Sequence, residues 1–372
     1  MFDRHTLWRH FITSLPLQAL TIGVLATLLA RMLWLTAPAT VTALDWTVYD
    51  TWLRHRALVA ISPTLTIVAR DPVSEAQFGT GPWDRAVLAQ LITTAHETGA
   101  AAIGIDQRLN HASPAHLGGA ASDALLLEAT KTAGHIVTVF DDEAPLASDA
   151  IVQGHLALSP HGDHVARSLP LFVEHGSQTL PSFGLALFSL AKNQPLSHGT
   201  GETRLVNVVG NGTLADLPTI PLSNVWKAIR QQDSTSLDGW LKDKVVVILS
   251  QAPSQSLWLL PTGQSVDGMT AQLQFLNSLL TENHLCQIGP FGRTGITMVV
   301  ATLIAWCLLR FHGSISLVFA AGAIALYAAM TAIILGGLHL VLPVALPLTA
   351  ALIVLLGTTA WTHLTAGQRL VL

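Results

Sequence analysis

The sequence predicts an α/β protein with an exported, mostly parallel sheet flanked by helices, and four transmembrane α-helices, one N-terminal and three C-terminal. Only 11% of the 372 residues are charged, whereas soluble proteins have about 25% charged residues. Part of the chain therefore belongs in lipid. The long apolar stretches lie near the two ends of the chain. Between them, short β-branched runs alternate with segments of helical periodicity, which is typical of parallel sheets.

The first apolar stretch, residues 15–35, contains a single charge, Arg31, and is long enough to cross a bilayer. It lacks the small-residue cleavage site of a secretory signal, so we expect the cell to retain it as an anchor. Arg4 and Arg9 precede it and favour a cytoplasmic N-terminus. Residues 1–36 are therefore predicted to be a cytoplasmic N-terminus and a signal-anchor helix.

Three more spans are predicted in residues 293–372. The first lies between Arg293 and Arg310, whose long side chains can snorkel to the membrane surface. Residues 311–368 contain no Asp, Glu, Lys or Arg, which leaves room for two further spans. The predicted spans are residues 294–309, 315–335 and 342–361. The chain therefore contacts membrane lipid at both ends.

Four spans return the C-terminus to the side where the chain begins. The sequence thus predicts a multi-pass protein of the bacterial inner membrane with both termini cytoplasmic and residues 37–292 in the periplasm. A net charge of −4 without basic runs gives no support for nucleic-acid binding.

The first half of the exported domain contains a strand–helix–strand unit. Residues 65–69 are a short apolar run that ends before Asp71, and Asp84 can cap the helix that follows. Residues 101–105 form a second buried strand with Asp106 at its end. Such a unit is right-handed with parallel strands. Both carboxylates then lie at the sheet edge where open α/β sheets bind ligands.

The rest of the domain continues the alternation of helices and strands. Residues 245–248 are four β-branched residues in succession, which predicts a central strand. We also expect Asp141, Asp142 and Glu143 to add acidic groups at the sheet edge. Further helices are expected over residues 44–54, from about 122, over 181–192 and 222–230, and from 267. Further strands are expected over residues 135–140 and 204–209, and two short ones with a turn within 151–175.

A small polar ligand pocket is predicted at the strand ends. Asp71, Ser74, Arg85 and Asp106 would line it, with Trp83 as a stacking wall. The alternative is that Arg85 pairs with one aspartate and only fixes the turn over the sheet edge. We favour this alternative, because structural ion pairs often resemble functional clusters.

Neither a metal site nor a cofactor is predicted. Several histidines occur in expected loops: His111, His116, His155, His161 and His164. They lack helical spacing and a cysteine partner, so we expect them to be exposed to solvent. The sequence contains no Gly-x-Ser-x-Gly elbow and no phosphate-binding glycine loop, which argues against an enzyme.

Small residues recur at helical spacing in the third predicted span. They are Gly322, Ala325, Ala329 and Ala332. Such a stripe indicates close packing against another span or another chain, and so predicts that the protein forms an oligomer through its membrane helices.

Several short motifs follow one another along most of the chain. They are an exit helix with Asp50 and Arg54, Asp71-x-x-Ser74, Gly81-Pro82-Trp83-Asp84-Arg85, Ile103-Gly104-Ile105-Asp106, a helix opening at Asp123, the strand at 245–248, Pro261-Thr262-Gly263, and Asp267-Gly268-Met269-Thr270-Ala271. In this order and spacing the chain resembles the type 2 CHASE family. These are extracytoplasmic sensory domains of bacterial cyclases, histidine kinases and protein kinases.

The sequence departs from the family pattern in three ways. It has Ser250 where the family tends to have Gly, and Thr270 where it tends to have His. No cyclase or kinase domain follows the last predicted span before Leu372. We therefore expect the output to come from a separate protein.

The resemblance implies a non-enzymatic sensory or regulatory protein that binds a ligand or partner outside the cell and signals through its spans to a protein partner. The alternative is a structural or scaffold subunit of a multi-subunit inner-membrane complex, with no ligand of its own. The state of the strand-end pocket separates the two, because a scaffold would have it filled by side chains.

Overall fold

A computed structural model describes residues 14–56, 59–109, 111–140, 151–160, 162–196, 202–251, 256–311 and 313–369. The chain divides into two compact units. One is Leu58–His284, and the other combines Met1–Ala57 with Leu285–Leu372. The predictions for Arg4, Arg9, Asp141, Asp142, Glu143 and His161 lie outside the described residues.

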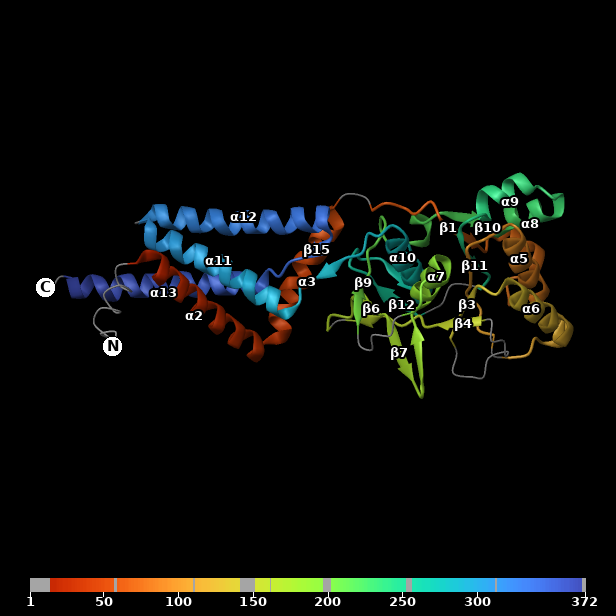
Figure 1. The fold of residues 1–372 in the computed structure, drawn as a ribbon, viewed down its shortest axis with the longest axis horizontal. Helices are drawn as coiled ribbons and strands as arrows, with labels where there is room; N and C mark the ends of the chain where they lie inside the picture. The colour runs from red at the N-terminus through yellow and green to blue at the C-terminus, as the bar shows by residue number, and fades with distance from the viewer. Residues whose placement is uncertain are drawn as a thin grey trace. The chain divides into compact units, whose positions relative to one another are not determined.

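The Leu58–His284 unit is built on a six-stranded parallel sheet (Figure 1). Its strands, in spatial order, are β10 (Thr219–Pro221), β1 (Leu65–Ala69), β11 (Val245–Leu249), β2 (Ala102–Ile105), β3 (Ile136–Val139) and β4 (Ile151–Gly154). The prediction that β1 and β2 run parallel is confirmed. They are not neighbours, however, because β11 lies between them and pairs with both.

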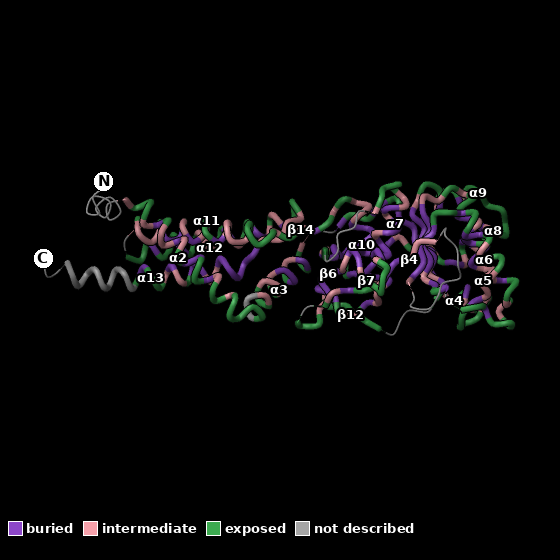
Figure 2. Tube along the Cα trace, turned by 60° about the horizontal axis from the view of Figure 1, so that its bottom comes forward, coloured by how far each residue is buried: buried purple, intermediate pink, exposed green. Residues whose placement is uncertain are grey.

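Helices cover both faces of this sheet, which explains why its strands are apolar at nearly every position. Side chains alternate between the faces. Val246 and Ile248 pack with one group of helices, and Val245 and Val247 pack with the other. The first group is α5 (Arg85–Glu97), α6 (Gly119–Ala133), α8 (Leu222–Gln231) and α9 (Ser234–Leu241). The second is α7 (Phe183–Lys192) and α10 (Gly268–Leu280). Figure 2 shows the buried sheet between these layers.

Helix α10 is buried on all sides for most of its length, so even its polar side chains lie inside the protein. Asn277 accepts a hydrogen bond from the Ser62 backbone N–H at 2.8 Å and donates one to the Ala60 carbonyl at 3.0 Å. Gln274 accepts one from the Val209 N–H at 2.8 Å. The polar residues of α10 thus tie down loops that are far away in the sequence.

A set of short antiparallel strands completes this unit. They are β5 (Ser159–Pro160), β6 (Ala166–Pro170) and β9 (Thr203–Leu205) in one sheet, with the pairs β7 (Phe172–His175) with β8 (Gln178–Pro181), and β12 (Leu257–Leu259) with β13 (Ser265–Asp267). The region 151–175 therefore contains more strands than predicted, and its first strand joins the parallel sheet. β9 is shorter than predicted, because the Gln274 side chain takes the Val209 N–H that a longer strand would use.

Short helical turns occur where only loops were predicted. Helix α4 (Pro72–Phe78) follows β1 directly, because Asp71 and Ser74 form a reciprocal capping box at its start. Helix α9 (Ser234–Leu241) and the 3-10 helices η1 (Ala115–Leu117) and η2 (Leu214–Asp216) were likewise not predicted.

The other unit contains three candidate membrane helices among the described residues. They are α2 (Leu15–Thr36), α11 (Pro290–Arg310) and α12 (Ser314–Leu338). The prediction of a fourth span over residues 342–361 is wrong. Helix α13 (Ala345–Arg369) begins later than predicted, because Leu340–Val341 form the strand β15. The apolar part of α13 among the described residues, Ala345–Thr359, is too short to cross a bilayer.

Small residues allow α2 and α11 to pack closely. A Cβ atom added to Gly23 would lie only 2.8 Å from the Thr302 Cα. By contrast, Gly322, Ala325 and Ala329 on α12 are exposed in this chain, so their packing against another chain stays a prediction. The unit also contains α3 (Pro38–His55) and the strand β14 (Cys286–Gln287), which pairs in parallel with β15.

Candidate functional site at the carboxyl edge of the sheet

Asp71 lies two residues after the end of β1 and holds the start of a distant helix. Its carboxylate accepts hydrogen bonds from the Ser223 backbone N–H at 3.0 Å and the Ser223 hydroxyl at 2.8 Å. Burial raises the pKa of Asp71, but the hydrogen bonds from Ser223, Ser74 and Val73 outweigh it, so the pKa lies below its ordinary value. The Asp71 side chain is therefore an ionised carboxylate whose hydrogen bonds anchor α8 to β1.

Asp106 plays the matching role after β2. It accepts hydrogen bonds from the Ser250 N–H at 3.0 Å, the Ser250 hydroxyl at 2.9 Å and the Gln251 N–H at 2.8 Å. Burial raises the pKa of Asp106 above its ordinary value, although these donors act in the opposite direction. The Ser250 hydroxyl thus adds a donor to this carboxylate that a glycine at this position would lack.

Arg85 does not join the two strand-end carboxylates. Its guanidinium pairs with Asp123 at 2.5 Å, and the other Asp123 oxygen accepts a hydrogen bond from the Ser113 N–H at 2.9 Å. The ion pair fixes the first residue of α5 against α6. The alternative that Arg85 pairs with one of the strand-end aspartates is therefore wrong in its partner, which is Asp123 of α6.

Trp83 is buried and covered, so it does not form an open stacking wall. Its indole N–H donates to the Gly79 carbonyl at 2.7 Å, and the Arg70 guanidinium carbon lies 4.7 Å from the ring centroid. Arg70 also pairs with Glu75 at 2.7 Å and donates to the Ser250 carbonyl at 3.2 Å.

Sequence reasoning did not identify Arg70 or Ser223 as members of this network. A signal existed for Arg70, because it is a charged residue between a buried strand and Asp71. No local signal existed for Ser223, which is 152 residues from Asp71.

The structure therefore brings Asp71, Ser74 and Asp106 to one sheet edge, as predicted, and places Arg85 in a separate ion pair. Ser74 is fully buried inside the α4 cap. The carboxylates of Asp71 and Asp106 already accept internal hydrogen bonds. A ligand at this edge must offer hydrogen-bond donors strong enough to compete with Ser223 or Ser250.

One predicted loop histidine is buried. His155 follows β4 and is 6% exposed, because its backbone pairs with Pro181 and Phe183. Burial lowers its pKa to about 4. The expectation of a solvent-exposed side chain is therefore wrong for His155, whereas His111, His116 and His164 are exposed. Within the described ranges, no three His, Cys, Asp or Glu residues are grouped in a way that could hold a metal ion.

No curated protein and no solved structure matches the chain. The family model of the CHASE2 domain, however, matches residues 23–310, which is more than half of the chain. The matched region begins within α2, contains the whole parallel sheet with Asp71 and Asp106 at its edge, and ends with α11. The chain therefore belongs to the CHASE2 domain family.

Proposed function

We propose that this chain is a non-enzymatic sensory or regulatory protein of a bacterial inner membrane. Its exported domain, residues 37–292, binds a ligand or a protein partner and signals through the membrane helices to a separate output protein. The CHASE2 match carries this proposal, because it points to extracellular sensing in signalling and includes most of α2, the sheet and α11 together.

Helix α10 is the element best suited to carry a signal. It is buried on all sides and holds loops that are far apart in the sequence. Its last residue, Leu280, precedes the start of α11 at Pro290 by ten positions. A ligand that favours one position of α10 would change the population of membrane-helix arrangements. The difference between the ligand's affinities for the two positions of α10 sets the size of that change.

The strand-edge residues Asp71, Ser74, Trp83, Arg85 and Asp106 are our candidates for ligand binding. Because the carboxylates of Asp71 and Asp106 accept internal hydrogen bonds, we propose that a ligand acts by exchange. A cationic or multiply donating group would replace Ser223 at Asp71 or Ser250 at Asp106. Release of either serine would loosen α8 or the segment after β11.

The scaffold function is the second candidate, and the same closed network favours it. Side chains already satisfy the edge that a receptor would keep open, as expected for a docking domain without a ligand. In that case the exported domain would hold a partner in a multi-subunit complex, and its own conformation would not change.

The orientation of the chain is also a proposal. We place the N-terminus in the cytoplasm and the exported domain in the periplasm. The prediction that the C-terminus is cytoplasmic rested on four spans. Three spans would place the two ends on opposite sides of the membrane.

Purification of the tagged chain from native membranes in a mild detergent, with quantitative mass spectrometry, tests the proposal. A sensor should bring down a signalling protein in fixed ratio. That protein's activity should change when Asp71→Ala replaces the wild type, while the matched exposed variant Gln77→Ala leaves it unchanged. A scaffold should bring down several subunits whose assembly, and not activity, depends on the chain. If deletion leaves the activity of every co-purified protein unaltered, the sensory proposal fails.

A further inference from the structure

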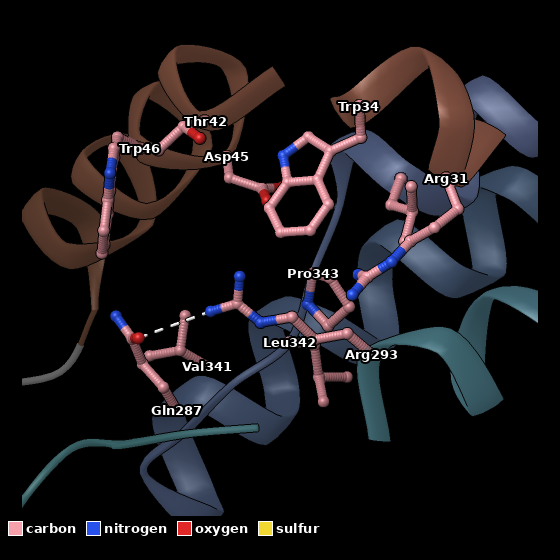
Figure 3. A pocket seen from close by; sticks show the side chains of 11 residues that line it. Arg31, Trp34, Thr42, Asp45, Trp46, Gln287, Arg293, Val341, Leu342 and Pro343 are labelled. Atoms are coloured by element: carbon pink, nitrogen blue, oxygen red, sulfur yellow. Dashed lines mark hydrogen bonds between the residues drawn. The ribbon is translucent and has the colours of Figure 1, made fainter. Parts of the chain in front are cut away.

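A small pocket lies at one end of the helices of the membrane unit (Figure 3). Arg31 and Trp34 line it from the last two turns of α2, and Arg293 lines it from the first turn of α11. Asp45 of α3 and Pro343 are also among the residues that line it. Because these positions end apolar helices, the pocket lies at the depth where tryptophan, arginine and lipid headgroups meet.

The pocket suits a small group. Its cavity volume is about 50 Å³. By the same measure of volume, one buried water molecule needs about 10–15 Å³. It therefore has room for a few water molecules or one small anion, and not for a drug-sized ligand.

One donor in this pocket lacks a partner. The Nη1 atom of Arg31 is buried and has no hydrogen-bond partner among the residues described, although the Arg31 guanidinium carbon lies 4.6 Å from the centroid of the Trp34 ring. The ring stabilises the positive charge but does not accept the N–H hydrogen bond in the guanidinium plane. A buried charged donor of this kind needs an acceptor.

The acidic residue of the pocket, Asp45, is not that acceptor in the structure, because Nη1 of Arg31 has no hydrogen-bond partner among the residues described. The Asp45 carboxylate accepts hydrogen bonds from the Val344 N–H at 2.8 Å and the Ala345 N–H at 2.6 Å. It therefore caps the start of α13. Arg293 donates to the Ile288 carbonyl at 2.9 Å, which holds its guanidinium beside the opening. In Figure 3 both guanidinium groups extend into the same space.

We propose that this pocket binds the phosphate group of an anionic phospholipid. Two guanidinium groups outnumber one capped carboxylate, and arginine is the residue that best matches phosphate oxygens. The tryptophan and the apolar helix ends accommodate the rest of the lipid. This site is independent of the strand edge and of any sensory role.

The test uses the delipidated full chain in a neutral detergent. Native mass spectrometry and thermal unfolding would be measured with phosphatidylglycerol, with zwitterionic phosphatidylcholine, and with inorganic phosphate. We expect phosphatidylglycerol to bind and to stabilise most. Arg31→Gln and Arg293→Gln should each weaken its binding about tenfold or more, since each removes charge-assisted hydrogen bonds.

Arg310→Gln is the matched control, because Arg310 lies at the opposite end of α11 and should leave binding unchanged. If Arg31→Gln fails to fold, Arg31→Lys keeps the charge and loses the fork geometry, and should still bind more weakly. The proposed site would be overturned if Arg310→Gln weakened phosphatidylglycerol binding as much as the two pocket variants do. It would also be overturned if neither pocket variant changed this binding. If inorganic phosphate stabilised the chain and phosphatidylglycerol did not, the pocket would bind free phosphate and the proposal of a lipid ligand would be overturned.

Discussion

At the scale of single residues, several polar side chains of the exported unit act on segments far away in the sequence. Asp71 holds Ser223, Asp106 holds Ser250, and Asn277 holds Ser62. Each buried acceptor is worth more than an exposed one, because leaving its donor unpaired carries a desolvation penalty. These residues are therefore sensitive positions for stability.

His155 should make the exported unit less stable in acid. Its pKa is about 4 in the folded chain and 6.5 as its ordinary value. The unfolded chain therefore takes up a proton below pH 6.5, while the folded chain does so only near pH 4. Unfolding free energy should fall by about 3 kcal/mol between these pH values.

His155→Asn should remove this pH dependence, because Asn has an acceptor for the Ala157 N–H that His155 Nδ1 now pairs with and does not titrate. The unfolding midpoint of the detergent-solubilised chain from pH 7 to pH 4 measures the effect. His116→Asn, at an exposed position, should behave like the wild type. Parallel pH curves for wild type and His155→Asn would refute the prediction.

Ser250→Ala should lower stability by about 1–2 kcal/mol, because Asp106 loses one of its three donors while remaining partly buried. Chemical denaturation with a fluorescence readout can measure it. Ser177→Ala, in the exposed turn between β7 and β8, provides a surface control with the same chemical change. No loss in Ser250→Ala would mean that water replaces the hydroxyl at no cost.

The position of the candidate site was predictable from the sequence, but its closure was not. Asp71 and Asp106 follow apolar runs, and parallel strands bring their carboxyl ends to one edge. Their donors follow β11 and begin α8, which are 144 and 152 residues away. No local pattern encodes such a pairing, so the sequence could not show whether the edge was open or filled.

At the scale of elements, apolar patterning identified the strands and helices better than their arrangement. The run at 245–248 correctly predicted a central strand, whereas its insertion between β1 and β2 depends on the packing of all the others. Helix α4 escaped prediction because seven residues carry little periodicity. The prediction of a fourth span is wrong because the apolar sequence continues through β15 and the proline-containing segment after it, where the chain is not helical.

Gly23→Ala should disrupt the packing of α2 on α11. The added methyl group would meet the Thr302 backbone at 2.8 Å, so one helix must move. We expect a lower thermal midpoint of the membrane unit in detergent, by several degrees for about 1–3 kcal/mol. Gly357→Ala on α13 is the control, since its methyl group would meet nothing within 4 Å. Equal midpoints for both variants would contradict the close approach.

Asn277→Ala should destabilise the exported unit by about 1–3 kcal/mol, because it leaves the buried Ser62 N–H without its partner and removes the hydrogen bond to the Ala60 carbonyl. The rate of amide hydrogen exchange in the segment before β1 should also rise in this variant. Gln231→Ala, at the exposed end of α8, should have little effect. Unchanged exchange before β1 would show that α10 does not anchor this segment.

At the scale of the whole molecule, the family match and the three apolar helices indicate a membrane protein with an extracytoplasmic CHASE2 domain. The orientation can be tested without knowledge of the ligand. In a background of Cys286→Ser and Cys307→Ser, single cysteines can be placed at exposed positions on either side of α11.

Gln77→Cys on α4 should react with a membrane-impermeant maleimide in spheroplasts, because Gln77 is exposed in the exported unit. Ser314→Cys at the start of α12 should react only after the membrane is disrupted, because α11 carries the chain to the other side. Gel shift of the labelled chain is the readout. Reaction of both positions in spheroplasts, or the reverse pattern, would rule out the proposed orientation.

The insertion of β11 between β1 and β2 also constrains how the protein is made. Residue 65 pairs with residue 245, so the centre of the sheet stays incomplete until most of the domain has emerged from the translocation channel. During that interval the facing edges of β1 and β2 expose unpaired backbone groups to proteases and to other nascent chains. Such a long-range pairing also slows folding. Biogenesis of this protein should therefore depend on chaperones more strongly than that of a domain whose neighbouring strands are consecutive.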